Sequence, residues 1–164
     1  MLDLFQSSLL ILSIFISIFI ISFFYTKNKS DSHYNVTKKE LLRNYMGFIF
    51  IIFGFLKLYD LPKFTKIFSK YDIISKKFRF YAFLYPFIEI IIGFLMIRNI
   101  QFQKTNIITI ILMVISIISV IYSIKNGEQL RCGCLGAFFH IPLSYITLSE
   151  NIVMLSMAVN LIQN

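Results

Sequence analysis

Two cysteines separated by a single glycine, Cys132 and Cys134, are the residues of this sequence best suited to chemistry. They are the only cysteines of the chain, and they lie between two apolar segments. A thiolate is the form of cysteine that attacks a disulfide or binds a metal ion. The pair therefore indicates either a redox-active dithiol or part of a metal site. A third interpretation is that both are small buried apolar residues.

The neighbours of the two cysteines favour the redox interpretation. Arg131 precedes Cys132, and its fixed positive charge favours the thiolate form. Gly133 and Gly136 permit backbone angles that other residues resist. A disulfide between residues two positions apart is strained, and strained disulfides are readily reduced. We therefore predict an exchange-competent pair, in which Cys132 attacks or is attacked and Cys134 resolves the mixed disulfide; the reverse assignment is the alternative.

The metal interpretation has fewer ligands to draw on. His140 is the one histidine near the two thiols, because His33 lies far along the chain. Two thiolates and one imidazole suit a soft ion such as Cu(I), whereas a closed zinc site requires a fourth ligand. Cys132, Cys134 and His140 are thus the alternative metal ligands, and a soft-metal permease or chaperone is the corresponding function.

The composition predicts a membrane protein. Of the 164 residues, 57% are hydrophobic and 15% are charged, whereas soluble domains average roughly 25% charged residues. Apolar runs of about 18 residues or more are long enough to cross a bilayer. The fold class we predict is an all-α integral membrane bundle. Its five expected spans are residues 4–25, 41–58, 80–97, 106–124 and the last part of 135–162.

The net charge of +8 fits the lipid bilayer better than nucleic acid as a partner. The basic residues lie between apolar runs, where they meet anionic headgroups and influence orientation. The segment 60–78 is amphipathic with a basic face, and we expect it to lie along the membrane surface. Charge alone does not fix the topology. We place the linker 27–40 in the cytoplasm, which puts the cysteine loop on the outside, where a disulfide persists.

Glu89 is the second point of chemical interest. An acid within a span is costly and usually faces the bundle interior. Proton handling, contact with a partner or a quinone-like ligand, and one interhelical hydrogen bond that fixes packing are the alternatives. Pro86 lies one turn earlier, where it frees a backbone carbonyl and favours a kink. The sequence requires no cofactor, and a quinone is the one candidate.

Two further patterns concern helix packing. Gly47 and Gly54 lie seven residues apart on one face, which allows another helix to approach closely. Lys57 and Asp60 lie three apart at the end of a span and are spaced to pair, although a solvated interface is the simpler expectation.

The start of the last span is less regular. The apolar stretch 135–162 is broken by Pro142. Thr147 and Glu150 have capping-box spacing, which predicts that a helix starts there. We therefore expect a short apolar element at 137–141, a bend, and then the final span.

These residues, in this order, resemble the MauE/DoxX family of redox-associated membrane proteins. The second span and its surface segment resemble the family's first helix, and Pro86, Glu89 and Gly93 are similar to its Pro-x-x-Glu-x-x-x-Gly helix. The resemblance is strongest at the Cys-x-Cys signature of the MauE branch. The matching residues are Gly54, Lys57, Phe64, Phe68, Tyr71, Tyr85-Pro86-Phe87-Ile88-Glu89, Gly93, Cys132-Gly133-Cys134-Leu135-Gly136 and Pro142-Leu143-Ser144.

The resemblance implies a four-helix membrane domain over 41–164, with the cysteines near its extracytoplasmic edge in the bacterial cytoplasmic membrane. Residues 1–26 are then an additional N-terminal transmembrane helix and 27–40 a polar linker. The implied function is thiol–disulfide or electron transfer that supports maturation of periplasmic proteins, as in methylamine utilisation, with a thioredoxin-like partner. Whether the protein is itself an oxidoreductase component or a non-catalytic scaffold of a maturation complex stays open at this point.

Overall fold

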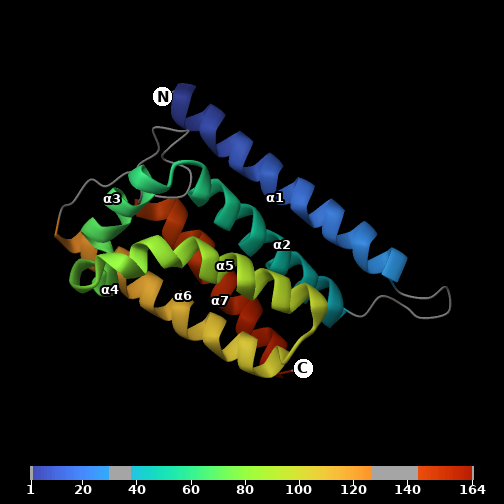
Figure 1. Cartoon of the computed structure of the whole chain (residues 1–164). Helices are drawn as coiled ribbons and strands as arrows, with labels where there is room; N and C mark the ends of the chain where they lie inside the picture. The colour runs from blue at the N-terminus through green and yellow to red at the C-terminus, as the bar shows by residue number, and fades with distance from the viewer. Residues whose placement is uncertain (1, 30–37, 127–143, 164) are drawn as a thin grey trace.

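The computed structural model describes residues 2–29, 38–126 and 144–163, and each regular element in these ranges is an α-helix (Figure 1). The predicted all-α class is therefore confirmed for the part of the chain that is described. The helices are α1 Leu2–Lys29, α2 Lys38–Tyr59, α3 Leu61–Tyr71, α4 Ile73–Lys77, α5 Arg79–Arg98, α6 Phe102–Lys125 and α7 Ser144–Gln163.

Three helices, α2, α5 and α6, are long and apolar enough to cross a membrane. They coincide with the predicted spans at 41–58, 80–97 and 106–124. Within the described residues, α1 and α7 contribute shorter apolar stretches, Ser13–Lys27 and Glu150–Ile162. The protein is thus a multi-pass membrane protein, and the crossing of the membrane by α1 and α7 stays a prediction.

Helices α2 and α5 approach each other closely because glycines line their contact. A Cβ atom added to Gly47 would lie 2.9 Å from the carbonyl oxygen of Gly93, and one added to Gly93 would lie 2.6 Å from that of Gly47. At Gly54, a Cβ atom would lie 3.0 Å from the carbonyl oxygen of Pro86. Any side chain would force the two backbones apart. The close approach predicted for Gly47 and Gly54 is confirmed, and α5 is the partner.

Helix α1 packs lengthwise against α2 with the opposite direction (Figure 1). Their contact contains polar groups. The Asn44 side-chain amide donates a hydrogen bond to Thr26 Oγ1 at 2.9 Å, and Ser22 Oγ donates to the Leu41 carbonyl at 3.3 Å. Interhelical hydrogen bonds of this kind hold helices together where lipid provides no hydrophobic driving force.

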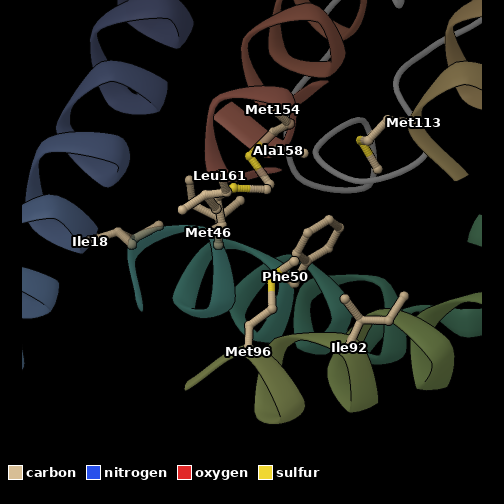
Figure 2. Close-up of a cluster of buried hydrophobic side chains, with 10 residues drawn as sticks. Ile18, Met46, Phe50, Ile92, Met96, Met113, Met154, Ala158 and Leu161 are labelled. Atoms are coloured by element: carbon tan, nitrogen blue, oxygen red, sulfur yellow. The ribbon is translucent and has the colours of Figure 1, made fainter. Parts of the chain in front are cut away.

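All five long helices meet in one apolar cluster, which is rich in methionine (Figure 2). Met46 and Met96 are completely buried in it. Methionine is unbranched and flexible, so that it fills the irregular space between helices that cross at different angles. The labelled members are Ile18 of α1, Met46 and Phe50 of α2, Ile92 and Met96 of α5, Met113 of α6, and Met154, Ala158 and Leu161 of α7.

The amphipathic segment 60–78 forms α3 and α4, joined at Asp72. Its large apolar residues, Phe64, Phe68 and Tyr71, are at most 4% exposed. They pack against α5, where the ring centroids of Phe68 and Tyr85 lie 4.6 Å apart. The apolar face of this segment therefore contacts the helix bundle, and its basic face remains exposed.

Helix α7 begins at Ser144, so the prediction of a helix start at Thr147 is wrong. Neither glycine nor proline occurs between these two positions, and nothing else there interrupts a helix. Glu150 consequently lies inside α7, and it lines an internal cavity instead of capping a helix.

Candidate functional site

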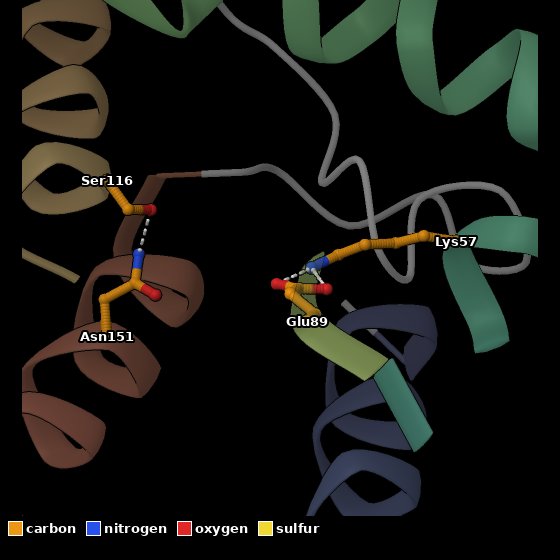
Figure 3. A network of polar contacts seen from close by, with 4 residues as sticks. All are labelled: Lys57, Glu89, Ser116 and Asn151. Carbon is orange, nitrogen blue, oxygen red and sulfur yellow. Dashed lines mark hydrogen bonds and ion pairs between the residues drawn. The ribbon is translucent and has the colours of Figure 1, made fainter. Parts of the chain in front are cut away.

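A buried ion pair joins α2 to α5. The ammonium group of Lys57, in the last turn of α2, contacts both carboxylate oxygens of Glu89 (Figure 3). Both side chains are 5% exposed. The pairing of Lys57 with Asp60, and the solvated alternative, are therefore wrong. Asp60 instead accepts a hydrogen bond from the backbone amide of Lys63 and caps the start of α3.

Aromatic rings surround this pair. The Lys57 ammonium lies 4.9 Å from the ring centre of Tyr85 and 5.8 Å from that of Phe64. Tyr85, one turn before Glu89, also hydrogen-bonds the Glu89 side chain. A lone charge inside an apolar bundle is costly, whereas a paired cation over aromatic faces is stabilised. The contact between Lys57 and Glu89, together with the rings of Tyr85 and Phe64, thus makes the burial of the two charges tolerable.

The ion pair lines an internal cavity of about 50 Å³. On the α6–α7 side of this cavity, the Asn151 side-chain amide donates a hydrogen bond to Ser116 Oγ at 2.9 Å (Figure 3). Glu150 also lines the cavity. The space suffices for on the order of three water molecules, but a cavity that binds benzene measures roughly 150 Å³. The volume of this cavity is thus about a third of that benzene-binding volume.

Of the predicted site residues, the described part of the chain contains Glu89 and Pro86. Both are buried in α5, and Glu89 has the interior position that we predicted. The structure brings Glu89 together with Lys57, and Pro86 with Gly54 of the same helix α2. The other predicted site residues lie outside the described residues: Arg131, Cys132, Gly133, Cys134, Gly136 and the alternative ligand His140.

The C-terminus of α6 and the N-terminus of α7, which flank the cysteine segment, lie at the same end of the bundle. Ser119 of α6 donates a hydrogen bond to Asp72 at 3.3 Å, which places the second half of α6 beside the α3–α4 junction. The Asn106 amide, near the start of α6, donates to the carbonyl of Ala158, near the end of α7, at 2.8 Å. Helices α6 and α7 are therefore antiparallel. It follows that α6 ends and α7 begins at the α3–α4 end of the bundle, where Lys57 also lies.

The family model of the methylamine utilisation protein MauE matches residues 37–163. The chain belongs to the MauE family. The resemblance deduced from the sequence is thereby confirmed, and the protein is a multi-pass membrane protein of a family described by methylamine utilisation. No curated protein and no solved structure matches the chain. Helix α1 precedes the matched residues and packs against α2.

Reasoning from the sequence missed the partner of Glu89 and several other buried polar residues. Lys57 and Glu89 are both charged residues within apolar helices, and the cost of an unpaired charge in a span is the signal that could have paired them. Asn44 and Asn106, each at most 1% exposed, carried a similar signal as amides within spans. Glu150 carried the same signal, as a charged residue within the apolar stretch 135–162, but its spacing from Thr147 suggested a cap.

Proposed function

We propose that this MauE-family protein carries out thiol–disulfide exchange through Cys132 and Cys134 at the outer face of the bacterial cytoplasmic membrane. The observation that carries the proposal is the position of the helix ends. Helices α6 and α7, which flank the cysteine segment, end and begin beside α3 and α4, at the rim of the bundle. An exchange site must meet a second protein, and the position of these two helix ends at the rim supports such access.

The exchange consists of two balanced substitutions at sulfur. The Cys132 thiolate attacks a disulfide of the partner, forms a mixed disulfide and releases one partner thiolate. The Cys134 thiolate then attacks Cys132 Sγ and releases the second partner thiolate. The partner gains two electrons and two protons, and the Cys132–Cys134 pair is oxidised; the reverse sequence oxidises a partner dithiol. Arg131 favours the thiolate, and Gly133 and Gly136 permit the tight backbone path.

A thioredoxin-like extracytoplasmic protein is the partner that fits this chemistry, because such proteins exchange disulfides with dithiols of similar potential. The exchange would serve maturation of proteins used in methylamine metabolism, in keeping with the family. In this proposal residues 41–164 form the four-helix domain. Glu89, paired with Lys57, and Pro86, in contact with Gly54, keep α2 and α5 in fixed register.

Thiol trapping in intact cells tests the side of the membrane and the redox state together. A membrane-impermeant maleimide should label the protein only after mild external reduction, because the pair is then released from its disulfide. The Cys132→Ser variant should be unable to form the mixed disulfide, whereas Cys134→Ser should accumulate it as a reducible adduct on a non-reducing gel. Labelling only from the cytoplasmic side contradicts the proposed orientation.

The same two variants separate exchange from the other functions. The activity to compare is the maturation of the extracytoplasmic proteins in cells that carry each variant. A scaffold retains this activity when both cysteines are serine, so full activity of Cys132→Ser/Cys134→Ser contradicts exchange. A soft-metal protein would be purified with about one copper ion per chain, and the double variant would lose it. The serine substitutions leave α2, α5 and the Lys57–Glu89 pair unchanged, so helical content measured by circular dichroism is the control for folding.

A further inference from the structure

A second pocket lies on the outside of the bundle, between α3 and the start of α5. Its volume is about 300 Å³, and its lining consists of Thr65, Lys66 and Ser69 of α3 with Arg79 and Phe83 of α5. Two cationic side chains and two hydroxyl groups therefore converge on one space, and none of the lining residues is acidic. The cavity at Lys57 is lined by other residues.

The start of α5 adds to the positive character of this pocket. Arg79 is the first residue of α5, and the preceding residue, Phe78, provides no side-chain hydrogen bond to the helix start. Asp60 and Asp72 provide such hydrogen bonds to α3 and α4. The first backbone N–H groups of a helix carry partial positive charge and form a favourable site for phosphate.

A stripe of aromatic rings leads from the pocket along α5. Phe80, Phe83 and Phe87 are 70%, 43% and 40% exposed. The ring centroids lie 6.2 Å apart between Phe80 and Phe83 and 5.7 Å apart between Phe83 and Phe87. Because α5 is a candidate membrane span, this exposed stripe faces acyl chains. The basic pocket thus lies where the helix passes from the headgroup layer into the hydrocarbon.

We propose that this pocket binds the phosphate of an anionic phospholipid, with Lys66 and Arg79 as the cationic contacts and Phe83 against the first acyl carbons. Free phosphate has the same anionic chemistry but would gain nothing from the aromatic stripe. A headgroup joined to acyl chains uses both surfaces, since the charged pocket and the exposed rings are adjacent on α5. This inference does not depend on the cysteine chemistry.

Lipid retention measured by native mass spectrometry tests the site. The full chain is purified from nanodiscs that contain equal amounts of phosphatidylglycerol and phosphatidylcholine. The wild type should retain phosphatidylglycerol preferentially, and Lys66→Gln/Arg79→Gln should lower that preference about thirtyfold, the effect of removing two basic contacts near an anionic headgroup. The control is Lys104→Gln/Lys125→Gln, which removes the same charge from exposed positions of α6 and should keep the preference.

Two further arms distinguish the alternatives. The charge-conserving variant Lys66→Arg/Arg79→Lys should keep phosphatidylglycerol, which separates loss of the phosphate contacts from disturbed folding. Millimolar inorganic phosphate should not displace the lipid, and displacement would assign the pocket to free phosphate. Equal retention of the two lipids by the wild type, or equal loss in the α3–α5 and α6 double variants, would overturn the proposal.

Discussion

The α2–α5 and α6–α7 pairs are both antiparallel, but different chemistry joins them. In α2–α5 the backbones touch at Gly47 and Gly93, and the Lys57–Glu89 ion pair joins the helices near the end of α2. In α6–α7 the contacts are uncharged hydrogen bonds, from Asn106 to a backbone carbonyl and from Asn151 to Ser116.

This difference determines how much the stability of each helix pair depends on a single interacting side chain. A charge left alone in the bundle has no water to solvate it, so the two members of the ion pair are needed together. An amide that loses its partner remains neutral, and interhelical hydrogen bonds of this kind contribute modestly in membranes. The α2–α5 pair should therefore be sensitive to single substitutions and the α6–α7 pair tolerant of them.

The largest effect should come from Lys57→Met. This change leaves the Glu89 carboxylate buried without its cation, and removal of one member of a buried ion pair costs about 3–5 kcal/mol. Unfolding by denaturant in mild detergent, followed by circular dichroism, measures the loss. The double variant Lys57→Met/Glu89→Met should regain most of the stability, because it removes both charges and keeps the volume. A single variant as stable as the wild type would show that the ion pair is dispensable.

Gly93→Ala should have the next largest effect. The new Cβ atom would lie 2.6 Å from the backbone oxygen of Gly47, and backbone cannot yield as a flexible side chain does. Overpacking of this kind costs about 1–3 kcal/mol. The control is Ile91→Ala, since Ile91 is 57% exposed on the same helix. The same unfolding assay should show a clearly smaller loss for the control; equal losses would mean that α2 and α5 are not in close contact.

The helices were predictable because long apolar runs have few alternatives in a membrane protein. Gly47 and Gly54 indicated a close contact through their spacing, and Glu89 had to face the interior because of its charge. The partner of Glu89 was harder to predict. Lys57 lies 32 residues away along the chain, and Asp60, three residues from Lys57, is a nearer carboxylate that sequence spacing favours.

Two other features could not be read from a pattern. The segment 60–78 has the same amphipathic pattern whether its apolar face contacts lipid or protein. In the structure this face contacts protein, because aromatic residues of α5 lie beside it, as the contact of Phe68 with Tyr85 illustrates. The start of α7 depends on where backbone hydrogen bonds begin. The capping-box pattern at Thr147 and Glu150 also occurs inside helices, so it does not locate a helix start by itself.

The smallest effect should come from the Asn151–Ser116 hydrogen bond. A double-mutant cycle with Asn151→Ala and Ser116→Ala should give a coupling of about 0.6 kcal/mol, the average for such bonds in membranes. Asn160→Ala is the control, because the Asn160 amide donates to Ser156 of its own helix, and it should show no coupling to Ser116. A coupling for Asn151 and Ser116 that equals or exceeds that of Lys57 and Glu89 would reverse the comparison, because uncharged amides would then hold the bundle as strongly as the buried charges do.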